Sequence, residues 1–306
     1  MNRSGGWLGN ASMAAQRIGG RPDLWIYGIL IALPFLGWLP LLLSVVPPVR
    51  ASDLAFLGAG FFSSSLFPWN VVLLAVIATV LMLAATFLAA LGEAGLLNPN
   101  GGPRGARSQV RAAEVAFSVL TAAALPAIAV IAALVSATAA VAPDEFSLPD
   151  LGVPLWLRIA SHLVPLIVAL AALTIVGQAV GAAALRRAIG PHCQSIGASL
   201  RDGVGDVIRH PARLIGLAIA STVADLVAVG LAIAILRVLW APIGPELASG
   251  SLVNPRAVVL LVGFVAIWLA TVLALGALRA WVSTWWSLEL GREIPEPRRE
   301  VQEAHL

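Results

Sequence analysis

Charge is what this sequence lacks most. Only 11% of its 306 residues are charged, whereas a soluble domain carries about one quarter. Lysine is absent, so all 19 basic residues are arginine. Hydrophobic residues make up 59% of the chain, and the mean hydropathy is +0.91. This composition excludes an ordinary soluble domain and is typical of an integral membrane protein.

Reactive side chains are also scarce. The single cysteine, Cys193, excludes an intrachain disulfide. His192 precedes it, but no second cysteine or nearby histidine completes a metal site, and the four histidines lie in separate regions. The glycine-rich run 98–105 lacks the Lys-Ser/Thr ending of a phosphate-binding loop. We therefore expect no metal, no cofactor and no catalytic residue, and we predict that the chain is not an enzyme.

Long apolar stretches dominate the rest of the chain. A helix needs about 20 mainly apolar residues to cross a bilayer. Six stretches meet this demand: Leu24–Val46, Val71–Leu97, Ala113–Val141, Leu157–Leu185, Leu214–Trp240 and Ala257–Leu288. They predict an all-α fold, a polytopic bundle of six transmembrane helices. Prolines inside the stretches are expected to kink these helices without ending them: Pro34, Pro40, Pro126 and Pro165.

The placement of arginine predicts the orientation. Most arginines lie before the first span, after the sixth, or in the second and fourth connections: Arg3, Arg17, Arg21, Arg104, Arg107, Arg111, Arg186, Arg187, Arg201, Arg209, Arg213, Arg292, Arg298 and Arg299. The other side has only Arg50, Arg158, Arg237 and Arg256. Because cytoplasmic loops are the arginine-rich ones, both termini are predicted to be cytoplasmic. Tryptophans near the ends of the spans agree with this assignment.

The same loops account for the formal net charge of +3, so the basic balance does not indicate a nucleic-acid partner. Arginine without lysine, together with abundant alanine, glycine and proline, suggests a GC-rich bacterial genome. We therefore predict a bacterial plasma-membrane protein whose partners are membrane lipids, other membrane proteins or a second copy of itself.

Three segments follow from the pattern of the chain. A cytoplasmic N-terminal segment (1–22) precedes a transmembrane domain (23–291), and a charged, proline-containing tail (292–306) is predicted to be disordered. The domain itself divides into three units of similar length, 9–97, 101–190 and 195–291, each a short lead-in followed by two spans. We predict a threefold repeat of helix hairpins.

One lead-in is clearly amphipathic. Between Gln194 and Arg209, apolar residues recur at helical spacing and form one face: Ile196, Leu200, Val204, Val207 and Ile208. Such a helix either lies in the plane of the membrane interface or packs on the inner face of the bundle. Residues 11–18 are a weaker equivalent ahead of the first span.

The layout of an amphipathic helix, the basic-proline junction 209–214 and a hairpin of long spans resembles a loose group of bacterial six-span membrane proteins. These are uncharacterised or similar to the membrane domain attached to some glycerophosphodiester phosphodiesterases. The resemblance rests on layout and not on a specific motif. It implies an all-helical bundle, and the phosphodiesterase catalytic domain has no room in this chain.

Asp225 is the sharpest candidate for a functional residue, since an ionisable group inside a span is costly. It lies near the middle of the fifth span. One interpretation is a proton- or cation-binding carboxylate that faces a cavity. The other is a structural carboxyl group hydrogen-bonded to Ser221, Thr222 or a neighbouring helix. We favour the second interpretation, because the sequence shows no basic partner at the same depth and no convergence of polar groups.

Other polar residues have simpler interpretations. Glu93 and Glu114 are predicted to form interfacial ion pairs with Arg107, Arg111 or Arg279. Gly177 and Gly181 have the small-xxx-small spacing that lets helices approach closely, which we assign to packing within the bundle rather than to a dimer face.

Arg158, His162 and Arg237 lie near outer span ends. The two arginines are expected to snorkel toward the headgroups, and the histidine to act as a packing donor.

These patterns rank the functions. A non-enzymatic accessory, assembly or lipid-handling membrane component comes first, because catalytic groups are missing. A small-solute or ion transporter that uses Asp225 is the alternative.

Overall fold

The computed structural model describes residues 7–46, 64–66, 69–97, 105–147, 155–189, 195–248 and 255–291. Every regular element in these ranges is a helix. Six helices are long and apolar enough to cross a bilayer: Asp23–Val45, Val72–Leu97, Gln109–Glu145, Val164–Ala188, Pro211–Trp240 and Val258–Glu289. The predicted all-α polytopic bundle is therefore confirmed, and the chain is an integral membrane protein.

The first span is not a uniform α-helix. It consists of α2 (Asp23–Ala32), a π-helical turn η1 (Leu33–Gly37) and α3 (Trp38–Val45). Pro34 lies in the π-turn, where a residue without an N–H cannot continue the ordinary ladder. The Trp268 indole N–H donates to the Gly37 carbonyl at 2.9 Å, so the neighbouring helix satisfies a backbone group of the turn.

The fourth span begins later than predicted. The stretch from Leu157 splits into a short helix α7 (Leu155–His162) and the long helix α8 (Val164–Ala188). Pro165 in the first turn of α8 has no N–H to donate to the preceding turn, and the chain breaks at Leu163 instead of kinking.

The other spans are single helices: α5 (Trp69–Leu97), α6 (Gly105–Ser147), α10 (Pro211–Trp240) and α12 (Pro255–Glu289). The short α11 (Ile243–Ala248) connects the last two. Pro126 and Pro143 lie inside α6 without ending it.

Two helices precede spans as lead-ins. They are α1 (Trp7–Gly19) and α9 (Ile196–Arg209). Ser195 caps α9, since its hydroxyl accepts the Ala198 N–H at 3.4 Å. The second unit has no separate lead-in among the described residues, because α6 runs without a break from Gly105. The threefold repeat stays a prediction, and the tail 292–306 lies outside the described residues.

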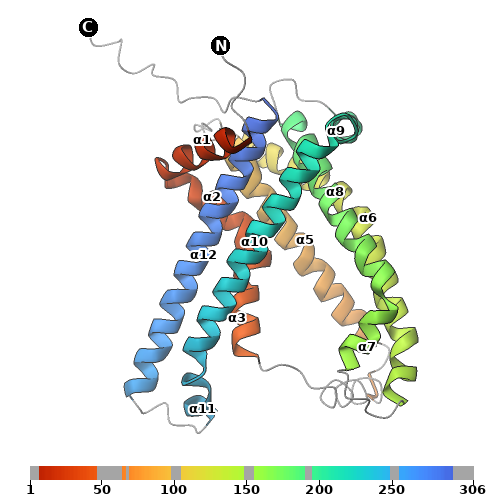
Figure 1. Ribbon diagram of the computed structural model, residues 1–306, viewed down its shortest axis with the longest axis vertical. Helices are drawn as coiled ribbons and strands as arrows, with labels where there is room; N and C mark the ends of the chain where they lie inside the picture. Colours follow the sequence, from red (N-terminus) through yellow and green to blue (C-terminus); the bar gives the residue numbers. More distant parts are fainter. Residues whose placement is uncertain are drawn as a thin grey trace.

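Figure 1 shows how the helices are arranged. They converge at the end that carries α1 and α9, and they spread apart toward the end that carries α7 and α11. We name the first the basic end, because most described arginines lie there: Arg17, Arg21, Arg111, Arg186, Arg187, Arg201, Arg209 and Arg213. The other is the open end. There α3, α10 and α12 form one group, and α6, α7 and α8 form another (Figure 1).

Close backbone contacts hold the basic end together. A Cβ on Gly28 of α2 would lie 1.9 Å from the Gly276 carbonyl oxygen of α12, so only glycine fits this crossing. Gly92 of α5 is similarly close to the Tyr27 carbonyl oxygen of α2, at 2.5 Å from an added Cβ. Small residues therefore set the approach of α2, α5 and α12.

Candidate functional site

A cavity of about 510 Å³ lies between the spans. Its walls come from α2, η1, α5, α6, α8, α10 and α12. The polar side chains that line it are Thr86, Glu93, Thr174, Gln178, Arg186, Thr222, Asp225, Arg279 and Ser283. The remaining lining residues are glycine or apolar. The structure thus brings together the polar groups whose convergence the sequence does not reveal.

An ion pair across α10 and α12 is the centre of this lining. Arg279 Nη2 lies 2.8 Å from Asp225 Oδ2, and the Asp225 side chain is only 9% exposed. The expectation that Asp225 has no basic partner is wrong, because α10 and α12 pack side by side and place the two residues at one level. Arg279, predicted to pair with Glu93 or Glu114, pairs with Asp225 instead.

Ser221 and Thr222 do not hold the carboxyl group of Asp225. The Ser221 hydroxyl donates to the Leu217 carbonyl at 2.7 Å, inside its own helix. The Thr222 hydroxyl lies 3.0 Å from Gln178 Oε1 and 2.9 Å from the Ala218 carbonyl. Thr222 therefore links α10 to α8 across the cavity wall, and Oδ1 of Asp225 is left buried without a hydrogen bond.

A second polar network joins α5, α8 and α12. The Ser283 hydroxyl donates to Glu93 Oε2 at 2.8 Å. Arg186, which is 3% exposed, donates from Nη2 to the Ser283 carbonyl at 2.5 Å and from Nε to the Ser287 hydroxyl at 3.0 Å. Glu93, predicted to form an interfacial ion pair, thus lines the cavity on the side of the basic end and accepts a hydrogen bond from a hydroxyl group.

The cavity changes character along its length. On α5, Ala89 and Thr86 follow Glu93 with increasing distance from the basic end, and on α8, Leu173 follows Gln178. The hydroxyl of Thr86 is bonded to the Met82 carbonyl of its own helix at 2.8 Å. The part of the cavity nearer the basic end is therefore charged, and the part nearer the open end is apolar.

The apolar part is open to its surroundings. Two of its lining side chains, Phe35 of η1 and Leu226 of α10, are 48% and 66% exposed. The apolar part of the cavity is therefore bordered by side chains that the protein does not cover.

Gly177 and Gly181 pack within the bundle, against α6. A Cβ on Gly177 would lie 2.9 Å from the Ala123 carbonyl oxygen, and one on Gly181 would lie 3.3 Å from the Ala123 Cβ. Both glycines and Ala123 also line the cavity. The close approach of α6 and α8 therefore forms one of its walls.

Glu114 lies elsewhere. It is exposed on α6 and does not line the cavity. Its predicted partner Arg107 has a side chain outside the described part of the structure, as do His192 and Cys193.

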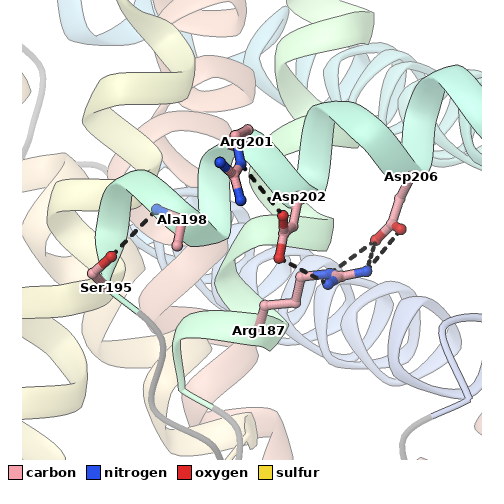
Figure 2. A network of polar contacts seen from close by, with 6 residues as sticks. All are labelled: Arg187, Ser195, Ala198, Arg201, Asp202 and Asp206. Carbon is pink, nitrogen blue, oxygen red and sulfur yellow. Dashed lines mark hydrogen bonds and ion pairs between the residues drawn. The ribbon is translucent and has the colours of Figure 1, made fainter.

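The predicted face of α9 is only partly the packing face. Ser199, Gly203 and Val207 are the buried residues of this helix, whereas Val204 and Ile208 are 43% and 73% exposed. Ion pairs also join α9 to α8, and we name them the clasp. Figure 2 shows that Arg187 of α8 bonds Asp206 through Nη2 at 2.7 Å and approaches Asp202 at 3.4 Å.

At the open end, the two arginines predicted to snorkel and the histidine predicted to be a packing donor have carboxylate or carbonyl partners. Glu145 of α6 lies 3.4 Å from Arg158 Nε and 2.9 Å from His162 Nε2, both on α7. Arg237 Nε donates to the Leu43 carbonyl at 3.1 Å, at the end of α3. These contacts tie α6 to α7 and α10 to α3. Among the residues that the structure describes, no three histidine, cysteine, aspartate or glutamate side chains form a metal-binding group.

Sequence reasoning missed Gln178, Arg186 and Ser283 as lining residues. One signal was available, since Glu93, Gln178 and Arg279 each lie among small residues near the inner end of the second span of a predicted unit. All three line the cavity.

Comparison with known proteins gives no relative. No family model matches the chain, and no curated protein or solved structure is detectably similar to it.

Proposed function

We propose that the chain is a non-enzymatic lipid-handling protein of the bacterial plasma membrane, with its basic end in the cytoplasm, and that the central cavity holds an amphiphilic molecule. The observation that carries this proposal is the two-part lining of that cavity. Charged and amide side chains from α5, α8, α10 and α12 meet at one part, and apolar side chains with exposed neighbours form the other. A lipid has the same two parts.

Physical cost supports a ligand rather than a purely structural role. Ionisable residues inside a span each cost about 2.5–3.5 kcal/mol at the centre on insertion scales. This chain places Asp225 near the middle of α10, pairs it with Arg279 of α12 and leaves space beside the pair. An accessory role that needs only helix packing does not explain both the buried charges and the cavity.

A small-solute or ion transporter is the second candidate. The buried Oδ1 of Asp225 without a hydrogen bond favours it, because transport sites gather polar groups near the middle of the membrane. A transport site for a small solute or an ion does not need the apolar part of the cavity, whereas lipid handling uses the charged part and the apolar part.

Native mass spectrometry of the gently extracted protein tests the proposal. We compare the wild type with Ala124→Trp, which fills the cavity from α6, and with Ala129→Trp, which adds the same bulk on an exposed position of α6 outside the cavity. A lipid adduct should persist in the wild type and in Ala129→Trp and be lost in Ala124→Trp.

An adduct that persists equally in all three proteins would be surface lipid and would contradict the proposal. Protein without any adduct would favour transport. Flux into liposomes, compared between the wild type and Asp225→Asn, would then test that candidate.

A further inference from the structure

We infer that the charged part of the cavity recognises a primary ammonium group next to a phosphate, the head group that phosphatidylethanolamine presents in a membrane. This inference rests on the proposed lipid-handling function and names the chemical class of the ligand. It follows from the hydrogen-bonding capacity that the lining leaves unused.

Asp225 supplies the first unused acceptor. Its side chain is more than nine-tenths buried, and Arg279 engages only Oδ2. Oδ1 has no hydrogen-bond partner, although a buried carboxylate oxygen without one is expensive. A donor that enters the cavity would complete this carboxylate.

Glu93 supplies a second acceptor from the neighbouring wall. Its Oε2 accepts the Ser283 hydroxyl at 2.8 Å, and within the described residues Oε1 has no hydrogen-bond partner. The carboxylates of Asp225 and Glu93 come from α10 and α5 and line the same cavity. Two carboxylates with open acceptor positions attract a cation that has several N–H donors.

Arg279 supplies the complementary charge. Its side chain is 24% exposed, and one nitrogen, Nε, is buried without a hydrogen bond. Guanidinium groups bind phosphate through parallel N–H donors. A ligand with an ammonium beside a phosphate therefore matches a lining that contains Glu93, Asp225 and Arg279 better than a purely anionic or purely cationic one.

The N–H donors distinguish phosphatidylethanolamine from phosphatidylcholine. The trimethylammonium of phosphatidylcholine has the same charge and the same phosphate but no N–H, so it cannot satisfy Oδ1 of Asp225 or Oε1 of Glu93. The apolar part of the cavity, lined by Phe35, Leu173 and Leu226, is suited to acyl chains and does not distinguish between the two lipids.

The test titrates delipidated protein in detergent with three lipids of identical acyl chains and reads the adducts by native mass spectrometry. The lipids are phosphatidylethanolamine, phosphatidylcholine and phosphatidylglycerol. We expect phosphatidylethanolamine to bind about tenfold more tightly than either of the others, which corresponds to about 1.4 kcal/mol. Soluble phosphoethanolamine, added as competitor, shows whether the head group binds without the acyl chains.

Glu93→Gln is the decisive variant. The glutamine still offers an oxygen to Ser283 but loses the charge, so the preference for phosphatidylethanolamine over phosphatidylcholine should fall to about twofold or less. Asp225→Asn should act in the same direction, but it leaves Arg279 without its counter-charge, and Glu93→Gln covers the case in which that variant does not fold. Glu114→Gln, on the exposed face of α6, is the matched control and should keep the tenfold preference.

Each outcome has a distinct meaning. Equal binding of all three lipids, still lost in Ala124→Trp, would overturn the ammonium inference and leave lipid handling intact, and so would a preference for phosphatidylglycerol. Loss of preference in Glu114→Gln as strong as in Glu93→Gln would also overturn the inference. No adduct sensitive to Ala124→Trp would remove both the inference and the proposed function. Full competition by phosphoethanolamine would assign the recognition to the soluble head group and not to the lipid.

Discussion

The two ends of this bundle differ in what surrounds their side chains. Near the basic end, α12 is enclosed, and its residues from Val282 to Ser287 are all buried. Toward the open end of the same helix, Val259, Val262 and Leu269 are 71%, 64% and 50% exposed. The difference shows that α12 has two environments, the protein interior at the basic end and the surrounding membrane at the open end. Protein packing requires a particular shape at the basic end, whereas lipid requires only hydrophobicity at the open end.

Breaking the ion pair between Asp225 and Arg279 should have the largest effect on stability. Replacement of one partner of a buried pair leaves an uncompensated charge and costs about 3–5 kcal/mol. Arg279→Met should therefore lower the free energy of unfolding by that amount, measured by denaturant titration in mixed micelles. The double variant Asp225→Leu/Arg279→Met should recover most of the loss. A double variant as unstable as the single one would show that the pair contributes through packing and not through charge.

The second-largest effect should come from truncating a buried leucine near the basic end, compared with an exposed leucine elsewhere. Leu185 is 1% exposed near the basic end, and Leu81 of α5 is 64% exposed. Leu185→Ala should cost about 2–5 kcal/mol because it leaves a cavity. Leu81→Ala should change stability by less than about 0.5 kcal/mol, as surface substitutions do. Equal losses in the same unfolding assay would contradict the distinction between the ends.

Glycine substitutions provide a third comparison, within α2 and α12. Gly28→Ala places a methyl group against the Gly276 carbonyl, and overpacking of this kind costs about 1–3 kcal/mol. Gly263→Ala of α12 meets nothing within 4 Å and should be neutral or stabilising by about 0.5–1 kcal/mol. Thermal unfolding midpoints that shift in opposite directions would match this expectation, and a midpoint lowered by both would not.

The clasp of α9 should give the smallest effect. Arg187 and Asp206 are 29% and 17% exposed, so Arg187→Met should cost about 1 kcal/mol or less. Because Arg187→Met removes the ion pairs to α9, amide hydrogen exchange along α9 should become faster. Arg201→Met, at a side chain that is 86% exposed, is the control and should leave exchange unchanged. If exchange in α9 is the same in both variants, the clasp does not hold the helix.

Much of the fold could be predicted, because length and apolar composition determine whether a helix spans a bilayer. The break before Val164 was not predicted, because a proline inside an apolar run is compatible with either a kink or a new start. The rotation of α9 was missed as well, because its apolar residues span both the packing face and the exposed face.

The site was predictable only in part. Asp225 was found because a carboxylate inside a span is unusual, and Gly177 and Gly181 because of their spacing. The partner of Asp225 was not, since Arg279 lies on another helix and their meeting depends on how α2, α10 and α12 pack. The contact of Gly28 with Gly276 helps to determine that packing, and no sequence period reveals it.

The separation of contacts along the chain has a consequence for biosynthesis. The clasp joins residues 15 and 19 positions apart, so it can form while the ribosome is still translating the later spans. Asn10 donates to Glu289 at 3.0 Å across 279 positions, and that contact must wait for the last span. Since chains are made from the N-terminus onward, α1 and α2 spend most of synthesis without α12. The final helix therefore completes the bundle. A nascent chain truncated before α12 would leave the packing surface for this helix exposed to membrane chaperones and proteases.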